Sequence, residues 1–122
     1  MKKNLIIFSK LFLLSLLFIA CAKKPTLIDL DASVNITKAI DSLPCLVNVE
    51  YNDVTNGTVK ESISSNWTTH RSLHSDQTGK LKATAISNIK TISIEILAKG
   101  STVSKNCNGT NCTIEIVRNM YD

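Results

Sequence analysis

A strict alternation of apolar and polar residues runs through most of this chain. Val47, Val49 and Tyr51 alternate with Asn48 and Glu50. This period of two puts apolar side chains on one face of an extended segment and polar side chains on the other, as a half-buried β-strand requires. The first expected strand also suits one turn of helix, whereas the others favour strands alone. We expect strands at 34–40, 45–51, 58–63, 66–73, 81–86, 91–98, 102–105 and 112–117.

Turn sequences separate these segments at short intervals. Asn56-Gly57 favours a type I′ turn, because both residue types tolerate positive φ. Further turns are expected at 76–79, 99–100 and 108–109. About seven or eight short strands at this spacing are typical of an antiparallel β-sandwich or a barrel, so the expected fold class is all-β.

The amino-terminal segment has the pattern of a secretory signal. Lys2 and Lys3 precede a short apolar run at 5–19. A basic start followed by such a run is typical of a signal peptide, and the run is too short for a comfortable membrane span. The segment therefore predicts export from the cytoplasm.

The end of this segment predicts a lipid anchor. Phe18-Ile19-Ala20-Cys21 resembles the bacterial lipobox, in which the cysteine receives lipid and the signal is removed in front of it. An ordinary cleaved signal with an incidental cysteine is the alternative. We expect a cell-envelope protein anchored to a bacterial membrane and facing the periplasm. The expected organisation is a signal peptide at 1–20, a lipidated tether at 21–32 and a β-sandwich domain at 33–122.

The net charge of the chain belongs largely to its signal. Loss of Lys2, Lys3 and Lys10 on processing would leave eleven Lys and Arg residues against ten Asp and Glu residues. A nearly neutral domain has no electrostatic reason to bind nucleic acid. We therefore expect no nucleic-acid partner.

Three cysteines remain after Cys21, and an oxidising compartment favours a disulfide. Cys107 and Cys112 flank a natural tight turn, so we expect them to pair across the end of a hairpin. Closing so short a loop stabilises a fold by roughly 2 kcal/mol in the chain-entropy model. A zinc site is the alternative, although there is no second close pair of cysteines. Whether Cys45 is free or competes for one of these partners stays open.

The polar candidates favour neither catalysis nor a metal site. His70 and His74 share one face of a strand or a helix, but Asp76 is the only carboxylate close to them in the sequence. Ser72, His74 and Asp76 would point the same way along a strand instead of converging on a substrate. No Gly-x-Ser-x-Gly elbow or phosphate-binding glycine loop is present. We expect no enzyme activity, no metal and no cofactor.

Two aromatic residues are the candidate core or contact positions. Trp67 and Tyr51 are two of the three aromatic residues that follow the signal. A buried tryptophan is common between the sheets of a sandwich, so the core is the favoured position for Trp67, and an exposed contact is the alternative. The polar faces near it are rich in hydroxyls and suit either solvent or carbohydrate. Their residues are Thr58, Ser62, Ser64, Ser65, Thr68 and Thr69.

The order of strands and turns between 45 and 117 resembles the small periplasmic domain of the MmpS family of transport accessory proteins. The shared features are a Val-x-Val-x-Tyr strand, a turn with Asn or Gly, a tryptophan in the next strand and a late hairpin with Gly. Tyr51, Trp67 and Gly100 occupy matching positions. Asn66 stands where the family commonly has proline, and a lipid would replace the family's transmembrane anchor. The resemblance implies an immunoglobulin-like β-sandwich of seven to eight strands that assists a membrane transporter, without catalytic residues.

The leading hypothesis is therefore a lipid-anchored cell-envelope lipoprotein. Its sandwich would act as a protein-interaction or transport accessory module, with the membrane and an envelope protein such as a transporter as partners. A periplasmic binder of a small sugar or lipid is the alternative. In that case the ligand would lie on the hydroxyl-rich face around Trp67.

Overall fold

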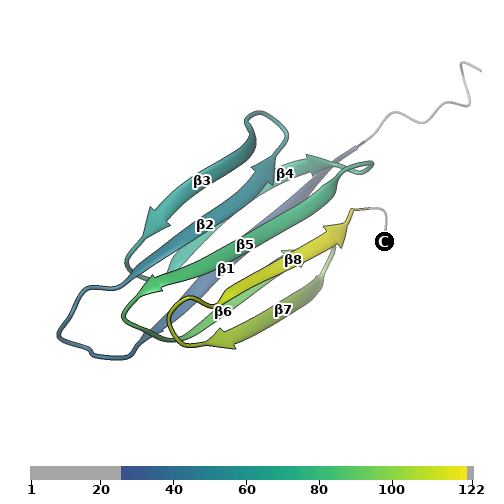
Figure 1. The fold of residues 1–122 in the computed structure, drawn as a ribbon. Helices are drawn as coiled ribbons and strands as arrows, with labels where there is room; N and C mark the ends of the chain where they lie inside the picture. The colour runs from purple at the N-terminus through teal and green to yellow at the C-terminus, as the bar shows by residue number, and fades with distance from the viewer. Residues whose placement is uncertain (1–25, 121–122) are drawn as a thin grey trace, which may run out of the picture.

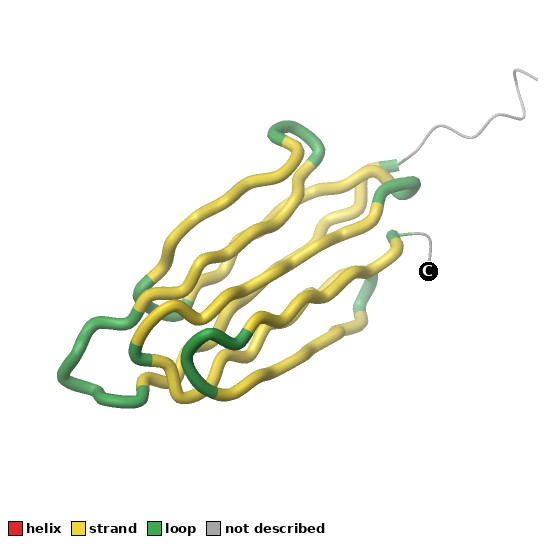
Figure 2. The backbone as a smooth tube through the Cα atoms, viewed as in Figure 1, coloured by secondary structure: helices red, strands yellow, loops and turns green. Residues whose placement is uncertain are grey.

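The computed structural model describes residues 26–120, and these form eight β-strands without a helix (Figures 1 and 2). The predicted all-β fold is confirmed, and the strands pack as an antiparallel sandwich. No described segment is a helix of the length and apolarity needed to cross a membrane. The strands are β1 (Leu27–Lys38), β2 (Leu46–Asp53), β3 (Gly57–Ile63), β4 (Trp67–His74), β5 (Thr78–Ser87), β6 (Ile89–Ala98), β7 (Ser101–Asn108) and β8 (Thr113–Asn119).

The strands form two four-stranded antiparallel sheets that face each other. Sheet A has the order β4-β1-β6-β7 and sheet B the order β3-β2-β5-β8. Of the connections between described strands, only β2–β3 and β6–β7 stay within a sheet, so the chain crosses repeatedly between layers. As a result, the two edges of each sheet come from distant parts of the sequence.

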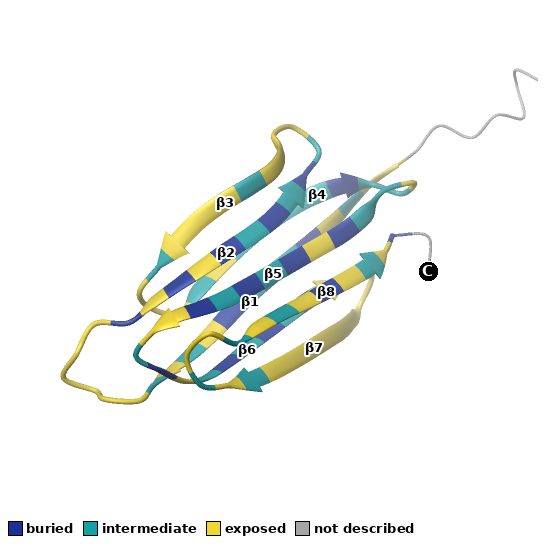
Figure 3. Ribbon diagram, viewed as in Figure 1, coloured by how far each residue is buried: buried dark blue, intermediate teal, exposed yellow. Residues whose placement is uncertain are grey.

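The core lies between the two inner faces, where the predicted alternation is visible as dark bands along β2, β5 and β6 (Figure 3). Aliphatic side chains dominate it, because β-branched residues pack well on a pleated surface. The inner faces of β5 and β6 bring alanines and isoleucines, respectively, so small and large side chains both contribute to the core. Its most deeply buried members include Val34, Val47, Val49, Leu73, Leu81, Ala83, Ala85, Ile92, Ile94 and Ile96.

The first strand begins earlier than predicted. β1 starts at Leu27, so the predicted tether at 21–32 is wrong for its last residues, and the domain begins before 33. Leu30, Ala32 and Val34 point into the core, and β1 pairs with both β4 and β6. Pairing on both sides also explains why this segment is a strand and not a helical turn. The predicted signal peptide and Cys21 lie outside the described residues.

The type I′ turn predicted at Asn56-Gly57 is wrong, and the turn with that geometry joins β6 to β7 instead. Lys99 and Gly100 have φ angles of 52° and 72° and join β6 to β7 in the two-residue turn that this geometry allows. At the other hairpin Gly57 alone has positive φ, at 65°. Three residues separate β2 from β3 there, and the Asp53 side chain accepts hydrogen bonds from the backbone N–H groups of Thr55 and Asn56. A side chain thus sets the conformation of this turn.

A disulfide joins the sheets along the β7–β8 side of the sandwich. Cys107 in β7 and Cys112 before β8 are bonded, as predicted, with 6.2 Å between their Cα atoms. The expected hairpin is wrong, since β7 belongs to sheet A and β8 to sheet B. Cys45 is free and buried, and its Sγ donates to the Ser64 carbonyl at 3.2 Å. The Cys107–Cys112 disulfide therefore connects the two sheets and not two neighbouring strands of one sheet.

Arg118 in β8 joins the same two edges near the β6–β7 turn. Its Nη1 donates to the Ser101 carbonyl at 2.7 Å and to the Ile96 carbonyl at 3.3 Å, and its Nη2 donates to the Ala98 carbonyl at 2.7 Å. We call this pair of edges, closed by Arg118 and the Cys107–Cys112 disulfide, the closed side of the sandwich.

Candidate functional site

The candidate site lies on the opposite side of the sandwich, between the edge strands β3 and β4. We call this side the open side. The side chains that form the site are Tyr51, Glu61, Trp67 and Arg71. Here the short β3–β4 connection, a hydrogen bond from the Val54 N–H to the Ser72 carbonyl at 3.2 Å and a cluster of side chains span the gap between the sheets. Trp67 and Arg71 lie on the inner face of β4, and Tyr51 reaches toward them from β2. The Tyr51 ring lies 5.1 Å from the Trp67 ring and 4.9 Å from the Arg71 guanidinium carbon. Tyr51 therefore packs against both an aromatic ring and a cation.

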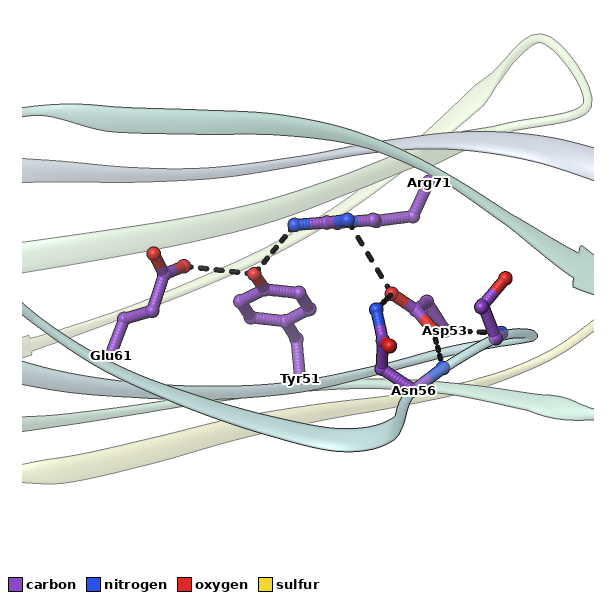
Figure 4. A network of polar contacts seen from close by, with 6 residues as sticks. Tyr51, Asp53, Asn56, Glu61 and Arg71 are labelled. Carbon is purple, nitrogen blue, oxygen red and sulfur yellow. Dashed lines mark hydrogen bonds and ion pairs between the residues drawn. The ribbon is translucent and has the colours of Figure 1, made fainter.

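The Tyr51 hydroxyl is the centre of a chain of hydrogen bonds (Figure 4). It donates to the Glu61 carboxylate at 2.8 Å and accepts from Arg71 Nη2 at 2.7 Å. Burial raises the pKa of Tyr51, and the hydrogen bond to Glu61 adds to the effect, while Arg71 opposes it. The neutral phenol therefore links the Glu61 carboxylate to the Arg71 guanidinium.

Asp53 anchors the other end of the chain. Its carboxylate is buried and lies 3.4 Å from Arg71 Nη1. Hydrogen bonds from the backbone N–H and side-chain amide of Asn56 and from the Thr55 N–H hold the pKa of Asp53 below its usual range, and Arg71 contributes a smaller attraction. The same carboxylate thus shapes the β2–β3 turn and positions the guanidinium.

The chemistry of the open side is that of a contact surface. Trp67 is half-buried and the Arg71 side chain is 31% exposed, whereas Tyr51 is buried beneath them. Arg71 Nε is buried without a hydrogen-bond partner among the described residues. Tryptophan, tyrosine and arginine are the residue types most enriched in binding hot spots. Edge strand β3 pairs only with β2 among the described strands, which leaves its outer backbone groups beside this cluster.

A hollow of about 400 Å³ lies on the outer face of sheet B, above β2, β3 and β5. Two lysines, two glutamates, one valine and short hydroxyl or amide residues surround it, and aromatic rings are absent from its lining. Ser62 Oγ donates to Asn48 Oδ1 at 2.9 Å across its floor. The hollow offers hydrogen-bonding groups to a polar ligand. Its lining residues are Asn48, Val49, Glu50, Lys60, Glu61, Ser62, Lys82 and Thr84.

Both histidines lie on the outer face of sheet A; His70 is exposed, as predicted, whereas His74 is half-buried, and its Nδ1 is buried without a hydrogen-bond partner among the described residues. His70 Nδ1 bonds to Asp31, and His70 Nε2 lies 3.9 Å from Asp29, two carboxylates that sequence proximity could not reveal. The hydrogen bond to Asp31 raises the pKa of His70. Ser72 donates to Asp29 at 2.9 Å, and Asp76 lies in the turn after β4 and not on the strand. Within residues 26–120 no cluster of three metal-binding side chains occurs.

The structure does not gather the hydroxyl-rich residues into one face around Trp67. Thr58 and Ser62 are on the outer face of sheet B, whereas Thr68 is on the outer face of sheet A. Thr69 points inward with Trp67. Trp67 itself lies between the two predicted positions, since it packs against the core and is still partly exposed. The predicted sugar face around Trp67 is therefore wrong in its geometry.

The sequence predicted Tyr51 and Trp67 as site residues but not their charged neighbours Arg71 and Glu61. Arg71 is four residues after Trp67 and Glu61 ten residues after Tyr51. Both occupy inward positions of edge strands, where the alternation calls for an apolar residue. A charged residue at an inward position of a predicted strand was the available signal.

Comparison with protein-family models and with curated proteins finds no match to this chain. The resemblance to the MmpS family stays a prediction from the order of strands and turns.

Proposed function

We propose that this chain is a lipid-anchored cell-envelope protein whose sandwich binds a protein partner through its open side, without catalysis. The anchor follows from the lipobox-like sequence that ends at Cys21. The sandwich then serves as a rigid support that presents one contact surface to the periplasm. A membrane transporter is the partner class that the resemblance to the MmpS family implies.

The observation that carries this proposal is the difference between the two sides of the sandwich. Both sides end in edge strands, but the closed side is tied by a disulfide and by Arg118, whereas the open side presents the partly exposed Trp67 and Arg71 beside the edge strand β3. A half-exposed aromatic ring held rigidly from below costs little conformational entropy on binding. Main-chain groups at a strand edge add affinity when a partner segment lies beside them.

Site-specific photo-crosslinking in intact cells tests the proposal. A photoreactive residue at position 60, in β3, should capture protein, whereas the same residue at 97, exposed on the outer face of the central strand β6, is a matched control away from both edges. Trp67→Ala should reduce capture from position 60 several-fold, and Trp67→Phe should retain most of it. Equal capture from positions 60 and 97, or capture from position 60 that Trp67→Ala leaves unchanged, would contradict the proposed surface. Cys21→Ser should release the protein from membranes.

The hollow above β2 supports a second candidate, a binder of a small polar ligand such as a saccharide. Lys60, Lys82 and Glu50 flank it, and hydroxyl and amide groups complete its lining. Saccharide sites gain much of their affinity from an aromatic platform, which this lining lacks, so we rank the candidate second. Titration with charged and neutral saccharides, followed by the amide chemical shifts of Asn48 and Thr84, tests it. Unchanged shifts at millimolar ligand would exclude it.

A further inference from the structure

A ladder of alternating charges crosses the outer face of sheet B. The register places Lys60 of β3 opposite Glu50 of β2, Glu50 opposite Lys82 of β5, and Lys82 opposite Glu115 of β8. Opposite charges at directly facing positions each stabilise a sheet by roughly 0.2–1 kcal/mol. This row of charges ends with the positively charged Lys60 in the edge strand β3 and with the negatively charged Glu115 in the edge strand β8.

These two edges complement each other. We propose that the partner of β3 is a second copy of this chain, whose β8 extends sheet B in a head-to-tail arrangement, with Glu115 of one copy opposite Lys60 of the next. This inference rests on the proposed function, because it assigns an occupant to the edge of the open side. Within the sheet β3 is antiparallel to β2, β2 to β5, and β5 to β8. A β8 added beside β3 would therefore again be antiparallel.

Two neighbouring positions fit the same register. With Lys60 opposite Glu115, Ser62 lies opposite Thr113 on the outer face, which continues a row of hydroxyl and amide side chains. On the inner face Val59 lies opposite Ile116. Neither strand contains proline, and the pairings of β3 with β2 and of β8 with β5 run without a register shift. Proline and bulges are common devices against edge pairing, and both edges lack them.

The edges of sheet A follow the same arrangement. If sheet B continues from copy to copy, β7 of the added copy lies beside β4. The register then places Lys105 opposite Trp67, because both are in line with Val34 and Ile94. Lys105 is exposed although it is on the inner face of its strand. A lysine over a tryptophan ring is an attractive contact, so each half-exposed residue would find a partner on the next copy.

Such a contact joins two different surfaces and does not close on itself, so it predicts chains of copies and not a symmetric dimer. A cysteine pair tests this directly. Ser62→Cys combined with Thr113→Cys in the full chain should form disulfide-linked ladders in the membrane under mild oxidation. Within one molecule these residues are separated by three strand spacings, roughly 14 Å, which is too far for a disulfide. The matched control, Ser62→Cys with Val117→Cys, should form at least several-fold less ladder.

Charge reversal separates this register from non-specific association. Lys60→Glu in the cysteine pair should reduce the ladder roughly fourfold or more, because an attraction becomes a repulsion. Glu115→Lys should act in the same way. The double reversal should restore the disulfide-linked oligomers. Within each molecule it still places a glutamate at position 60 opposite Glu50 and a lysine at position 115 opposite Lys82, so both internal repulsions remain. Recovery can therefore come only from the contact between copies. Far-UV circular dichroism of each variant checks that it is folded.

The outcomes distinguish the two proposals. Disulfide-linked oligomers that decrease with each single charge reversal and recover with the double reversal support assembly of the chain with itself. No ladder, with other proteins captured from position 60, overturns this inference and leaves the proposed function standing. Ladders of equal intensity in the matched control also overturn it, since they would show collision without register. No ladder and no captured protein would overturn both.

Discussion

The hydrogen bond between Tyr51 and Arg71 should couple the stabilities of these two side chains. Tyr51→Phe removes the hydroxyl and leaves Arg71 Nη2 without its partner at 2.7 Å. Arg71→Met removes the same bond, the cation above the Tyr51 ring and the ion pair with Asp53. The perturbation is therefore a double-mutant cycle on two residues that share one interaction.

The magnitude follows from burial and charge. A hydrogen bond to a charged group contributes about 1.5–3 kcal/mol, and the lower end applies because the Arg71 side chain is 31% exposed. Tyr51→Phe should lower the free energy of unfolding by about 2 kcal/mol. Arg71→Met should cost more, because a cation–π contact adds about 0.5–1 kcal/mol and the buried Asp53 carboxylate also loses its ion pair. The double variant should be about 1.5 kcal/mol more stable than the sum of the two single effects predicts.

Equilibrium unfolding in urea measures these energies. Trp67 is the single tryptophan of the chain and reports on the site by fluorescence, while far-UV circular dichroism reports on both sheets. Tyr51→Phe with Arg118→Met is the matched control, because Arg118 makes its bonds on the closed side. The control pair should be additive. Additivity of Tyr51→Phe with Arg71→Met within about 0.4 kcal/mol would refute the coupling.

Three further predictions concern the rest of the sandwich. Replacing both Cys107 and Cys112 by Ser should lower the free energy of unfolding by about 2 kcal/mol, the entropic value for so short a loop, measured in urea; an unchanged midpoint would contradict it. His70→Asn should lower the melting temperature at pH 5 but not at pH 9. The pKa of His70 is raised because Asp31 stabilises the charged imidazole in the folded state. The stability gained from this contact is complete below the pKa of the unfolded state and is lost as the pH rises through the pKa of the folded state. Asn88→Gly should loosen the loop before β2, which the Asn88 amide holds by hydrogen bonds to its carbonyls, and faster amide exchange there would show it; Asn88→Ala should cost a further ~1 kcal/mol, because φ at this position is 55°.

The strands could be predicted because their signal is local. The alternation of Val47, Val49 and Tyr51 with polar neighbours identifies both a strand and its buried face, and the structure confirms each. The start of β1 was missed because Leu27 and Ile28 lie close to Pro25 and to lysines that indicate a tether. Pairing of β1 with β4, some forty residues later in the chain, keeps this segment extended.

The candidate site could be predicted only in part. Tyr51 and Trp67 were noticeable because aromatic residues are rare here, but nothing in the sequence indicates that their rings meet. Arg71 and Glu61 are charged residues at inward positions, and whether such a position is buried in a centre strand or open at an edge depends on strand order. An edge position tolerates a charge that reaches solvent, whereas a central one does not.

The sequence by itself predicted the all-β class, the buried face of the alternating strands and a disulfide between Cys107 and Cys112, because all of these follow from residues a few positions apart. Only the tertiary structure decided which strands are edges, that the disulfide joins two sheets, and that Lys60, Glu50, Lys82 and Glu115 form one ladder. The physical reason is that every alternating strand can pair with every other in several registers of similar local quality. The choice among them comes from filling one common core with all eight strands at once.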